Sequence, residues 1–292
     1  MLKRISCLLL CLALFAGISL TQATAADVDA EPEIQVTETP AEDVPAPTDG
    51  NPRIYVDGVA LENVSSNLIG NTTYVPLRGV VRALRPDAEI SWVDNHAIVT
   101  AEDLSITVWP DASYFVANGR YLYLPDGAKL IGGSTMLPVR KLAQALGAAV
   151  DWDAETNSVL ITSGTGAIVS GDEYYNAGVL DLMSHIIYAE SGNQSLEGMV
   201  AVGNIILNRV NSPIFPNTVS EVIYQAGQFY PANSRIFGWT PNANSVIAAK
   251  LCLDGASVIP ATAFYYNGVG LSCWASRNKT CVAVIGAHAF YG

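Results

Sequence analysis

The sequence has few charged side chains, and its basic residues are scarcer than its acidic ones. Only 14% of the 292 residues are charged and 50% are hydrophobic, so a sizeable core can be buried and a disordered chain is excluded. The 15 Lys and Arg against 27 Asp and Glu give a net charge of −12, and no basic patch indicates a nucleic-acid partner. The length predicts two domains.

Histidine is also scarce, with only His96, His185 and His288 in the whole chain. A structural or catalytic zinc ion needs three or four His, Cys or acidic ligands at close spacing. The few histidines and the cysteine spacing match no such pattern. We therefore expect no metal site and no cofactor.

Long hydrophobic runs are absent after the first 25 residues. Segment 1–25 has two basic residues near its start, Lys3 and Arg4, continues as an apolar run to Leu20 and ends in an A-x-A-like pattern at Ala25, which is typical of a secretory signal peptide. The run is shorter than the ~20 apolar residues that a membrane span needs. We predict that the mature chain begins near Ala26 and is secreted, in association with the cell wall.

Export would place the remaining cysteines in an oxidising compartment. Cys7 and Cys11 leave with the signal peptide. Cys273 and Cys281 bracket the nine-residue loop "CWASRNKTC", and we predict a disulfide between them. Cys252 is then expected to be a free thiol in the core.

Changes in composition along the mature chain indicate a linker, a joint and two domains. Residues 27–50 carry eight acids, four prolines and no base, which predicts a solvated linker over 26–51. A Gly/Ser-rich segment predicts a joint at 166–175. We therefore expect one domain over 52–165 and a second over 176–292.

The first predicted domain contains an internal repeat, because segments 74–100 and 136–162 echo each other. Each runs from a proline and an arginine into a short amphipathic helix, and then into two strands, the first of which contains a tryptophan. The equivalent residues are Pro76 and Pro138, Arg78 and Arg140, and Trp92 and Trp152. We interpret the two arginines as structural residues at helix starts. Two such units predict a compact α+β domain.

This doubled pattern resembles the domain family named after the N-terminal stalk domain of copper amine oxidases, which occurs in exported bacterial proteins. The resemblance implies an extracytoplasmic spacer or a module associated with the cell wall. It does not imply copper, since no His or Cys cluster is present to hold it.

The second predicted domain has longer helices. A helix with one apolar face is expected to end near Glu190, because Gly192 follows as a stop signal; its buried positions are Val179, Leu182, Met183, Ile186 and Ile187. Ser195 is the expected N-cap of the next helix, and Thr240 that of a later one. The strand "TAFYY" and the final "VAVIGAHAFYG" add a small β element. The predicted fold class of the chain is therefore α+β, with two domains.

Five ordered motifs in this domain resemble the spore cortex-lytic (SleB-type) cell-wall hydrolase catalytic domain: "AESGNQSLEGMVAVGNIILNRV", "FPNTVSEVIYQAGQF", "AFYYN", "CWASR" and "IGAHAFY". The resemblance implies a lysozyme-like, mostly helical fold that acts on peptidoglycan glycan strands, and leaves open whether these belong to the spore cortex or to the vegetative wall. It also implies that Glu190 is the catalytic acid. Two positions depart from the family pattern, where Gln194 replaces a second glutamate and Ala226 replaces a proline.

The chemistry of glycosidic cleavage supports the same residue. A carboxylic acid protonates the leaving oxygen at neutral pH if apolar surroundings raise its pKa. Glu197 is explained as a first-turn acid of a helix and Glu221 by a capping box, so a mechanism with a single acid is favoured. In such a mechanism the 6-hydroxyl of N-acetylmuramic acid is the nucleophile and the product is a 1,6-anhydro end.

Aromatic residues on the loops of this domain are expected to stack on sugar rings. The predicted substrate-binding residues are Phe229, Tyr230, Tyr265, Tyr266, Trp274 and His288, and the predicted supporting residues are Glu197, Gln228 and Ser276. Three alternatives stay open at this point. They are hydrolysis of the same bond by a muramidase-type reaction, an N-acetylmuramoyl-L-alanine amidase, and a wall-binding protein without activity.

Overall fold

The computed structural model describes residues 50–233 and 235–292. The predicted signal peptide at 1–25 and nearly all of the predicted linker at 26–51 lie outside the described residues. Among the helices that the structure describes, none is both long enough and apolar enough to cross a membrane.

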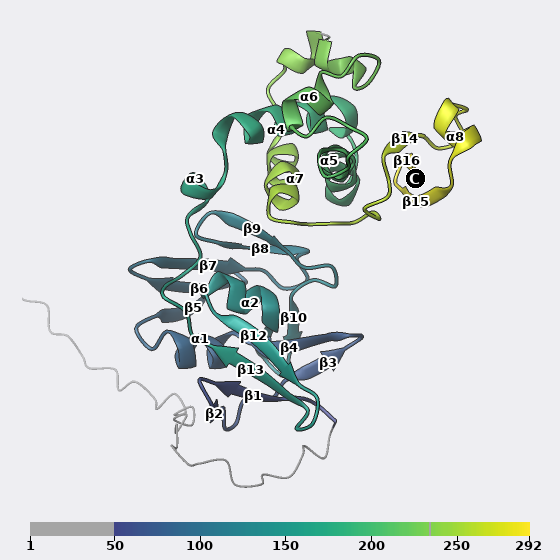
Figure 1. Ribbon diagram of the computed structural model, residues 1–292. Coiled ribbons are helices and arrows are strands. Elements are labelled where there is room, and N and C mark those ends of the chain that lie inside the picture. The colour runs from purple at the N-terminus through teal and green to yellow at the C-terminus, as the bar shows by residue number, and fades with distance from the viewer. Residues whose placement is uncertain (1–49, 234) are drawn as a thin grey trace, which may run out of the picture. The chain divides into compact units, whose positions relative to one another are not determined.

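The first domain is rich in strands and contains two units with the same order of elements (Figure 1). The first unit comprises β3 (Asn67–Ile69), β4 (Thr72–Pro76), α1 (Leu77–Leu84), β5 (Glu89–Val93) and β6 (His96–Ala101). The second comprises β10 (Lys129–Ile131), β11 (Ser134–Pro138), α2 (Val139–Ala145), β12 (Ala149–Asp153) and β13 (Ser158–Thr162). The other strands are β1 (Arg53–Val56), β2 (Val59–Ala60), β7 (Leu104–Val108), β8 (Tyr114–Ala117) and β9 (Arg120–Tyr123).

The two units pair through equivalent strands. In the sheet β10-β11-β4-β3, the central strands β4 and β11 are antiparallel and Val75 lies opposite Leu137. These residues are equivalent in the two units, and antiparallel pairing of equivalent residues relates the units by a local two-fold rotation. Both residues are fully buried. The pairing therefore places the apolar positions of both units in one shared core.

Two further sheets complete this domain. Strands β5-β6-β7-β8-β9 form an antiparallel sheet, and β12-β13-β1-β2 form a sheet in which β1 and β13 run parallel. The helices α1 and α2 each begin directly after a proline, whose fixed φ suits a helix start. Their apolar residues join one hydrophobic cluster with residues of the strands, including Val80, Leu142 and Phe115.

The second domain is mostly helical and carries a small sheet. Its helices are α3 (Gly171–Tyr174), α4 (Ala177–Ser191), α5 (Leu196–Val210), α6 (Val219–Ile223), η1 (Tyr230–Asn233), η2 (Arg235–Gly238), α7 (Ala243–Leu253) and α8 (Trp274–Asn278). The strands β14 (Tyr265–Gly268), β15 (Cys281–Ile285) and β16 (His288–Tyr291) form the sheet β14-β16-β15. The α+β class predicted from the sequence is confirmed.

The core of the second domain lies where α4, α5 and α7 meet, and these helices lie side by side in Figure 1. Met183, Ile186 and Ile187 are fully buried there, which confirms the predicted apolar face. Ser195 caps α5 as predicted, since its hydroxyl accepts from the N–H of Gly198. The prediction of Thr240 as a cap is wrong, because the side chain of Asn242 accepts from the N–H of Ser245 and α7 begins two residues later than expected.

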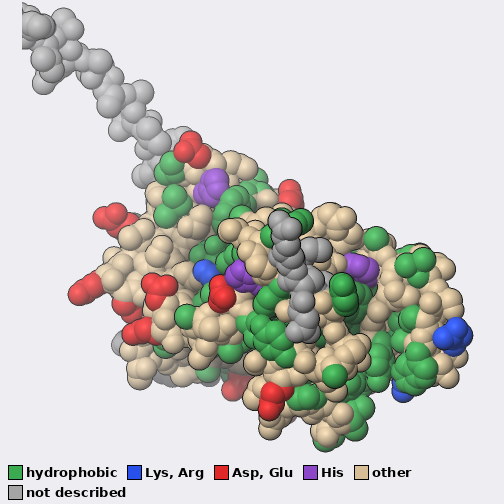
Figure 2. Space-filling model, turned by 90° about the horizontal axis from the view of Figure 1, so that it is seen from above, with side chains coloured by type: hydrophobic (Ala, Val, Ile, Leu, Met, Phe, Trp, Pro, Cys, Tyr) green, Lys and Arg blue, Asp and Glu red, His purple; other side chains and the backbone are tan. Residues whose placement is uncertain are grey.

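On the face of the molecule seen in Figure 2, Lys and Arg side chains are few, and acidic side chains are scattered without forming a patch. A nucleic-acid interface needs a cluster of basic side chains on one face. This face therefore offers no such cluster among the residues that are described.

Candidate active site

Glu190 lies in the last turn of α4, at a tight corner that leads into α5. The helix ends at Ser191, and a side chain at Gly192 would approach the carbonyl oxygen of Tyr188 to 2.6 Å. Glycine therefore allows the chain to turn immediately after Glu190. The capping of α5 by Ser195 fixes the other side of the corner.

The carboxyl group of Glu190 is held by one hydrogen bond. The phenol of Tyr266 on β14 donates to Oε2 of Glu190 at 2.5 Å. Burial raises the pKa of Glu190 above its usual value, and the hydrogen bond from Tyr266 opposes this rise only in part. The same burial, with the nearby carboxylate, raises the pKa of Tyr266 well above its usual value, so the phenol stays a donor. Glu190 thus has the environment of a general acid.

A cleft of about 740 Å³ opens beside this carboxyl group. It brings together Glu190, all six predicted substrate-binding residues and the predicted supporting residue Gln228. Its lining is Glu190, Arg209, Gly227, Gln228, Phe229, Tyr230, Tyr265, Tyr266, Asn267, Gly268, Cys273, Trp274, Ala275 and His288. Among these described lining residues, Glu190 is the one acidic side chain.

The aromatic side chains of the cleft divide into two groups. Tyr230 and Trp274 are 85% and 54% exposed, so their ring faces are open to a ligand. Tyr265 packs edge-on against Trp274, with 5.5 Å between ring centroids, and so supports that ring. Phe229 is buried and has a φ of +24°, a strained value for a side chain of this size.

His288 on β16 lies edge-on against Tyr266, with ring centroids 5.3 Å apart. Its Nδ1 atom is buried and has no hydrogen-bond partner within the described part of the chain. Burial lowers the pKa of His288, so the ring is neutral at neutral pH. His288 therefore packs against the Tyr266 side of the cleft as a neutral ring.

Arg209 is a cleft residue that the sequence analysis missed. It is 3% exposed, and its Nε donates to the carbonyl oxygen of Phe264 at 2.8 Å. Its guanidinium lies 5.2 Å from the ring centroid of Phe229 and 5.6 Å from that of Tyr265. A basic residue in the last turn of a helix is ordinary, because it complements the helix dipole, so the sequence held no signal of this role.

Two predicted supporting residues lie outside the cleft. Glu197 is exposed in the first turn of α5, as expected of an acid at a helix N-terminus. The hydroxyl of Ser276 bonds the backbone N–H and carbonyl of Cys273 and so caps α8. Gln194, which replaces a family glutamate, accepts from the N–H of Ala287 at 3.0 Å and thereby ties the corner after α4 to the β15–β16 turn.

The predicted disulfide is absent, since Cys273 and Cys281 are both free thiols in the structure. The sulfur of Cys273 accepts from the N–H of Ser276 as the N-cap of α8, whereas Cys281 lies at the start of β15 and donates to the carbonyl of Ala283. Each sulfur is thus directed to its own local backbone partner. Cys252 is a buried free thiol, as predicted. No described group of three or more His, Cys, Asp and Glu residues is placed to hold a metal ion.

Comparison with known proteins finds one family match in each domain. Residues 193–291 match the family described as cell wall hydrolase, and residues 55–161 match the copper amine oxidase N-terminal domain. The first range begins just after Glu190, so the role of Glu190 depends on the geometry described above.

Curated relatives are named spore cortex-lytic enzyme. The relative from Oceanobacillus iheyensis is 31% identical over 135 residues, which are 46% of this chain and 48% of that protein. The relative from Bacillus subtilis (strain 168) is 30% identical over 110 residues, 37% of this chain and 36% of that protein. The chain thus spans less than half the length of these relatives.

A solved structure, the catalytic domain of the Bacillus cereus SleB protein, is 31% identical and has a TM-score of 0.38. The match covers 40% of this chain and 92% of that one. Each half of the chain is thus similar to a known family, residues 55–161 to the copper amine oxidase N-terminal domain and residues 193–291 to the cell wall hydrolases.

Proposed function

We propose that the second domain cleaves the glycosidic bond between N-acetylmuramic acid and N-acetylglucosamine in peptidoglycan, as a lytic transglycosylase. The observation that carries the proposal is the position of Glu190 as the one acidic side chain among the described residues of an aromatic cleft. The cell wall hydrolase match and the relatives named spore cortex-lytic enzyme support peptidoglycan as the substrate.

In the first step, the protonated carboxyl of Glu190 transfers its proton to the oxygen that leaves with N-acetylglucosamine. The bond between this oxygen and the anomeric carbon of N-acetylmuramic acid breaks, and positive charge develops on the sugar ring. Burial raises the pKa of Glu190 and so favours the protonated form that this step needs. The hydrogen bond from Tyr266 occupies Oε2 and so leaves Oε1 to carry the proton.

In the second step, the 6-hydroxyl of the same N-acetylmuramic acid attacks the anomeric carbon. Its proton passes to the carboxylate of Glu190, which regenerates the acid, and a 1,6-anhydro ring closes without consuming water. Because one carboxyl group acts first as acid and then as base, no second carboxylate is required. A two-carboxylate glycosidase instead places its acids about 5 to 9.5 Å apart across the bond.

We further propose that the protein acts outside the cytoplasmic membrane, on spore cortex or vegetative cell wall. The support is the signal-like pattern at 1–25 together with the substrate that the cell wall hydrolase match implies. The first domain would then associate with the cell wall.

Mass spectrometry of digested peptidoglycan tests the reaction. We expect the mature protein to release muropeptides with 1,6-anhydro ends from purified cortex or vegetative peptidoglycan. Reducing N-acetylmuramic acid ends would show hydrolysis by water instead, and free stem peptides would show an amidase. Absence of any soluble product from both substrates, with the protein folded, would support a wall-binding protein without activity.

The hydrogen bond from Tyr266 should set the pH range of the reaction. This bond stabilises the carboxylate and so lowers the pKa of Glu190, in opposition to burial, which raises it. Tyr266→Phe removes the bond, so the pKa of Glu190 should rise further. Activity needs the protonated acid and is lost as the pH rises through this pKa. The variant should therefore lose activity at a higher pH than the wild type.

The measurement is the pH dependence of muropeptide release. Tyr265→Phe is the matched control, because Tyr265 lines the same cleft and Tyr266, not Tyr265, bonds Glu190. A shift of the basic limb to lower pH in Tyr266→Phe, or an equal shift in both variants, would contradict the assigned role.

A further inference from the structure

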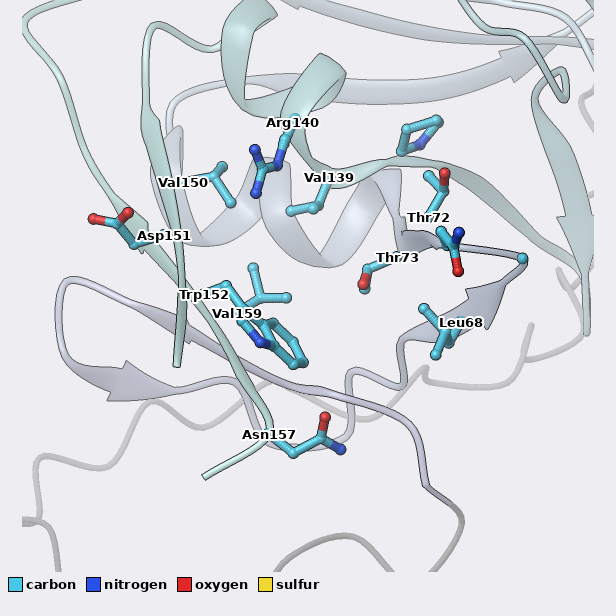
Figure 3. Close-up of a pocket in the computed structure, with 13 residues that line it drawn as sticks. Leu68, Thr72, Thr73, Val139, Arg140, Val150, Asp151, Trp152, Asn157 and Val159 are labelled. Atoms are coloured by element: carbon cyan, nitrogen blue, oxygen red, sulfur yellow. The ribbon is translucent and has the colours of Figure 1, made fainter. Parts of the chain in front are cut away.

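The first domain contains a cavity of about 410 Å³ that the proposed reaction does not use. It lies between the β3–β4 hairpin of the first repeat and the start of α2 with strands β12 and β13 of the second repeat (Figure 3). A volume in this range is typical of sites for small ligands. The cavity is thus formed where the two repeats meet, so neither repeat could form it alone.

Trp152 forms one wall of this cavity. It lies on β12, which is the edge strand of its sheet, and it is 46% exposed. Figure 3 shows its ring next to Val159, with Leu68 and Thr73 of the first repeat at the other side. A large aromatic ring left open to solvent inside a cavity presents a flat apolar face to a ligand.

Arg140 supplies a positive charge to the same cavity. Figure 3 shows its guanidinium extending from the start of α2 into the space above Trp152, whereas the carboxylate of Asp151 points away from the ring. Arg140 is exposed and has no ion-pair partner in the described part of the chain. Its charge is therefore available to an acidic ligand. Thr72 and Thr73 add hydroxyl groups to the lining.

An open indole face, hydroxyl groups and an unpaired guanidinium together fit a sugar ring that carries an acidic substituent. The apolar C–H face of a pyranose stacks on an aromatic ring, its hydroxyls take hydrogen bonds, and a carboxylate bonds the guanidinium. We propose that this cavity is a second saccharide-binding site, which holds N-acetylmuramic acid through its sugar ring and the carboxylate of its stem peptide.

The choice of peptidoglycan as the ligand rests on the proposed function of the second domain. The preference of the cavity for an acidic sugar is argued from its own residues and is independent of that function. Such a site would keep the protein on the glycan mesh while the catalytic cleft engages and releases individual bonds. Two linked sites raise the effective concentration of the polymer at the cleft.

The repeat provides an internal control. Trp92 on β5 is the equivalent residue of the first repeat and is also 46% exposed, but it does not line this cavity. Trp274 lies in the catalytic cleft. The indole N–H signals of these three residues, assigned by single Trp→Phe variants, therefore report separately on the proposed site, on an exposed surface and on the cleft.

The experiment is an NMR titration of the mature Glu190→Gln protein with a soluble disaccharide muropeptide. We expect the Trp152 signal to shift in a saturable way and the Trp92 signal to stay in place. No shift of Trp152, or equal shifts of Trp152 and Trp92, would overturn the proposal. The Trp274 signal tests the cleft independently, so failure of the proposed function is read separately from failure of this site.

The acidic group is tested with Arg140→Gln. The variant should weaken binding of the muropeptide at the Trp152 site about tenfold, because a charge-assisted hydrogen bond is lost, and leave binding of a neutral N-acetylglucosamine oligomer there unchanged. A free stem peptide that shifts Trp152 as strongly as the muropeptide would identify a peptide site and overturn the saccharide assignment.

Discussion

Glu190→Gln is expected to lower the release of muropeptides from purified peptidoglycan by about 10²- to 10⁴-fold, the usual effect of losing a general acid. The amide keeps the shape of the side chain and can still accept the hydrogen bond from Tyr266, but it has no proton to transfer. Since burial already disfavours the charged form of Glu190, the neutral amide should leave the thermal unfolding temperature unchanged or slightly higher.

Glu197→Gln is the matched control for this experiment. Glu197 is an exposed acid on the neighbouring helix and lies outside the cleft, so its variant should release muropeptides at close to the wild-type rate. If Glu190→Gln is folded and keeps near wild-type release, Glu190 is only a helix-end residue and the assigned active site is wrong. A large loss in Glu197→Gln would instead indicate a second acid in the mechanism.

Gly203→Val is expected to destabilise the second domain by about 3 kcal/mol, because overpacking a close helix contact forces helices apart. Gly203 lies in α5, where a Cβ atom would approach Sγ of Cys252 on α7 to 2.5 Å and Cδ1 of Ile187 on α4 to 3.1 Å. Both neighbours are buried, so neither can move away freely. The free energy of unfolding by urea measures the effect.

Two variants show whether the close contact is the cause. Gly178→Val places the same side chain at an exposed position of α4, where the nearest atom is 3.5 Å from the Cβ position, and should change stability by about 0.5 kcal/mol or less. Cys252→Ala removes the nearest sulfur, so the double variant with Gly203→Val should recover part of the loss. If Gly178→Val and Gly203→Val lose the same free energy of unfolding, the cause is the low helix propensity of valine and not the close contact.

Both experiments concern the same part of the structure. The contact at Gly203 holds α5 against α4 and α7, and Glu190 lies at the corner between α4 and α5. A change in the distance between these helices would therefore move the carboxyl group relative to Tyr266 on β14. Muropeptide release by Gly203→Val should fall further than the loss of folded protein alone explains.

Local signals in the sequence predicted much of the second domain. The apolar spacing of α4, the stop at Gly192 and the cap at Ser195 act within one or two helical turns, so the corner that carries Glu190 could be found from neighbouring residues. The ordered motifs contain most of the predicted substrate-binding residues, and the structure collects all six of these residues in one cleft with Glu190, although strands and helices rather than loops carry most of them. The repeated pattern predicted the two equivalent units of the first domain in the same way.

Two predictions made from neighbouring residues were wrong, namely the disulfide between Cys273 and Cys281 and the cap of α7. The spacing of Cys273 and Cys281 allows a disulfide, but the direction of each sulfur depends on the helix and strand that hold it. At α7, both Thr240 and Asn242 suit a cap, and the choice depended on which side chain meets the free N–H groups of the first turn.

The sequence by itself determined the fold class, the helix corner at Glu190 and the set of aromatic residues, because these follow from periodicity, caps and motifs that act over short stretches of chain. The tertiary structure alone decided the bond between Glu190 and Tyr266, which are 76 residues apart, and the burial of Arg209 beside them. It also decided the cavity between the two repeats of the first domain. Each of these depends on the approach of distant segments, and a pattern of neighbouring residues does not specify the distance between them.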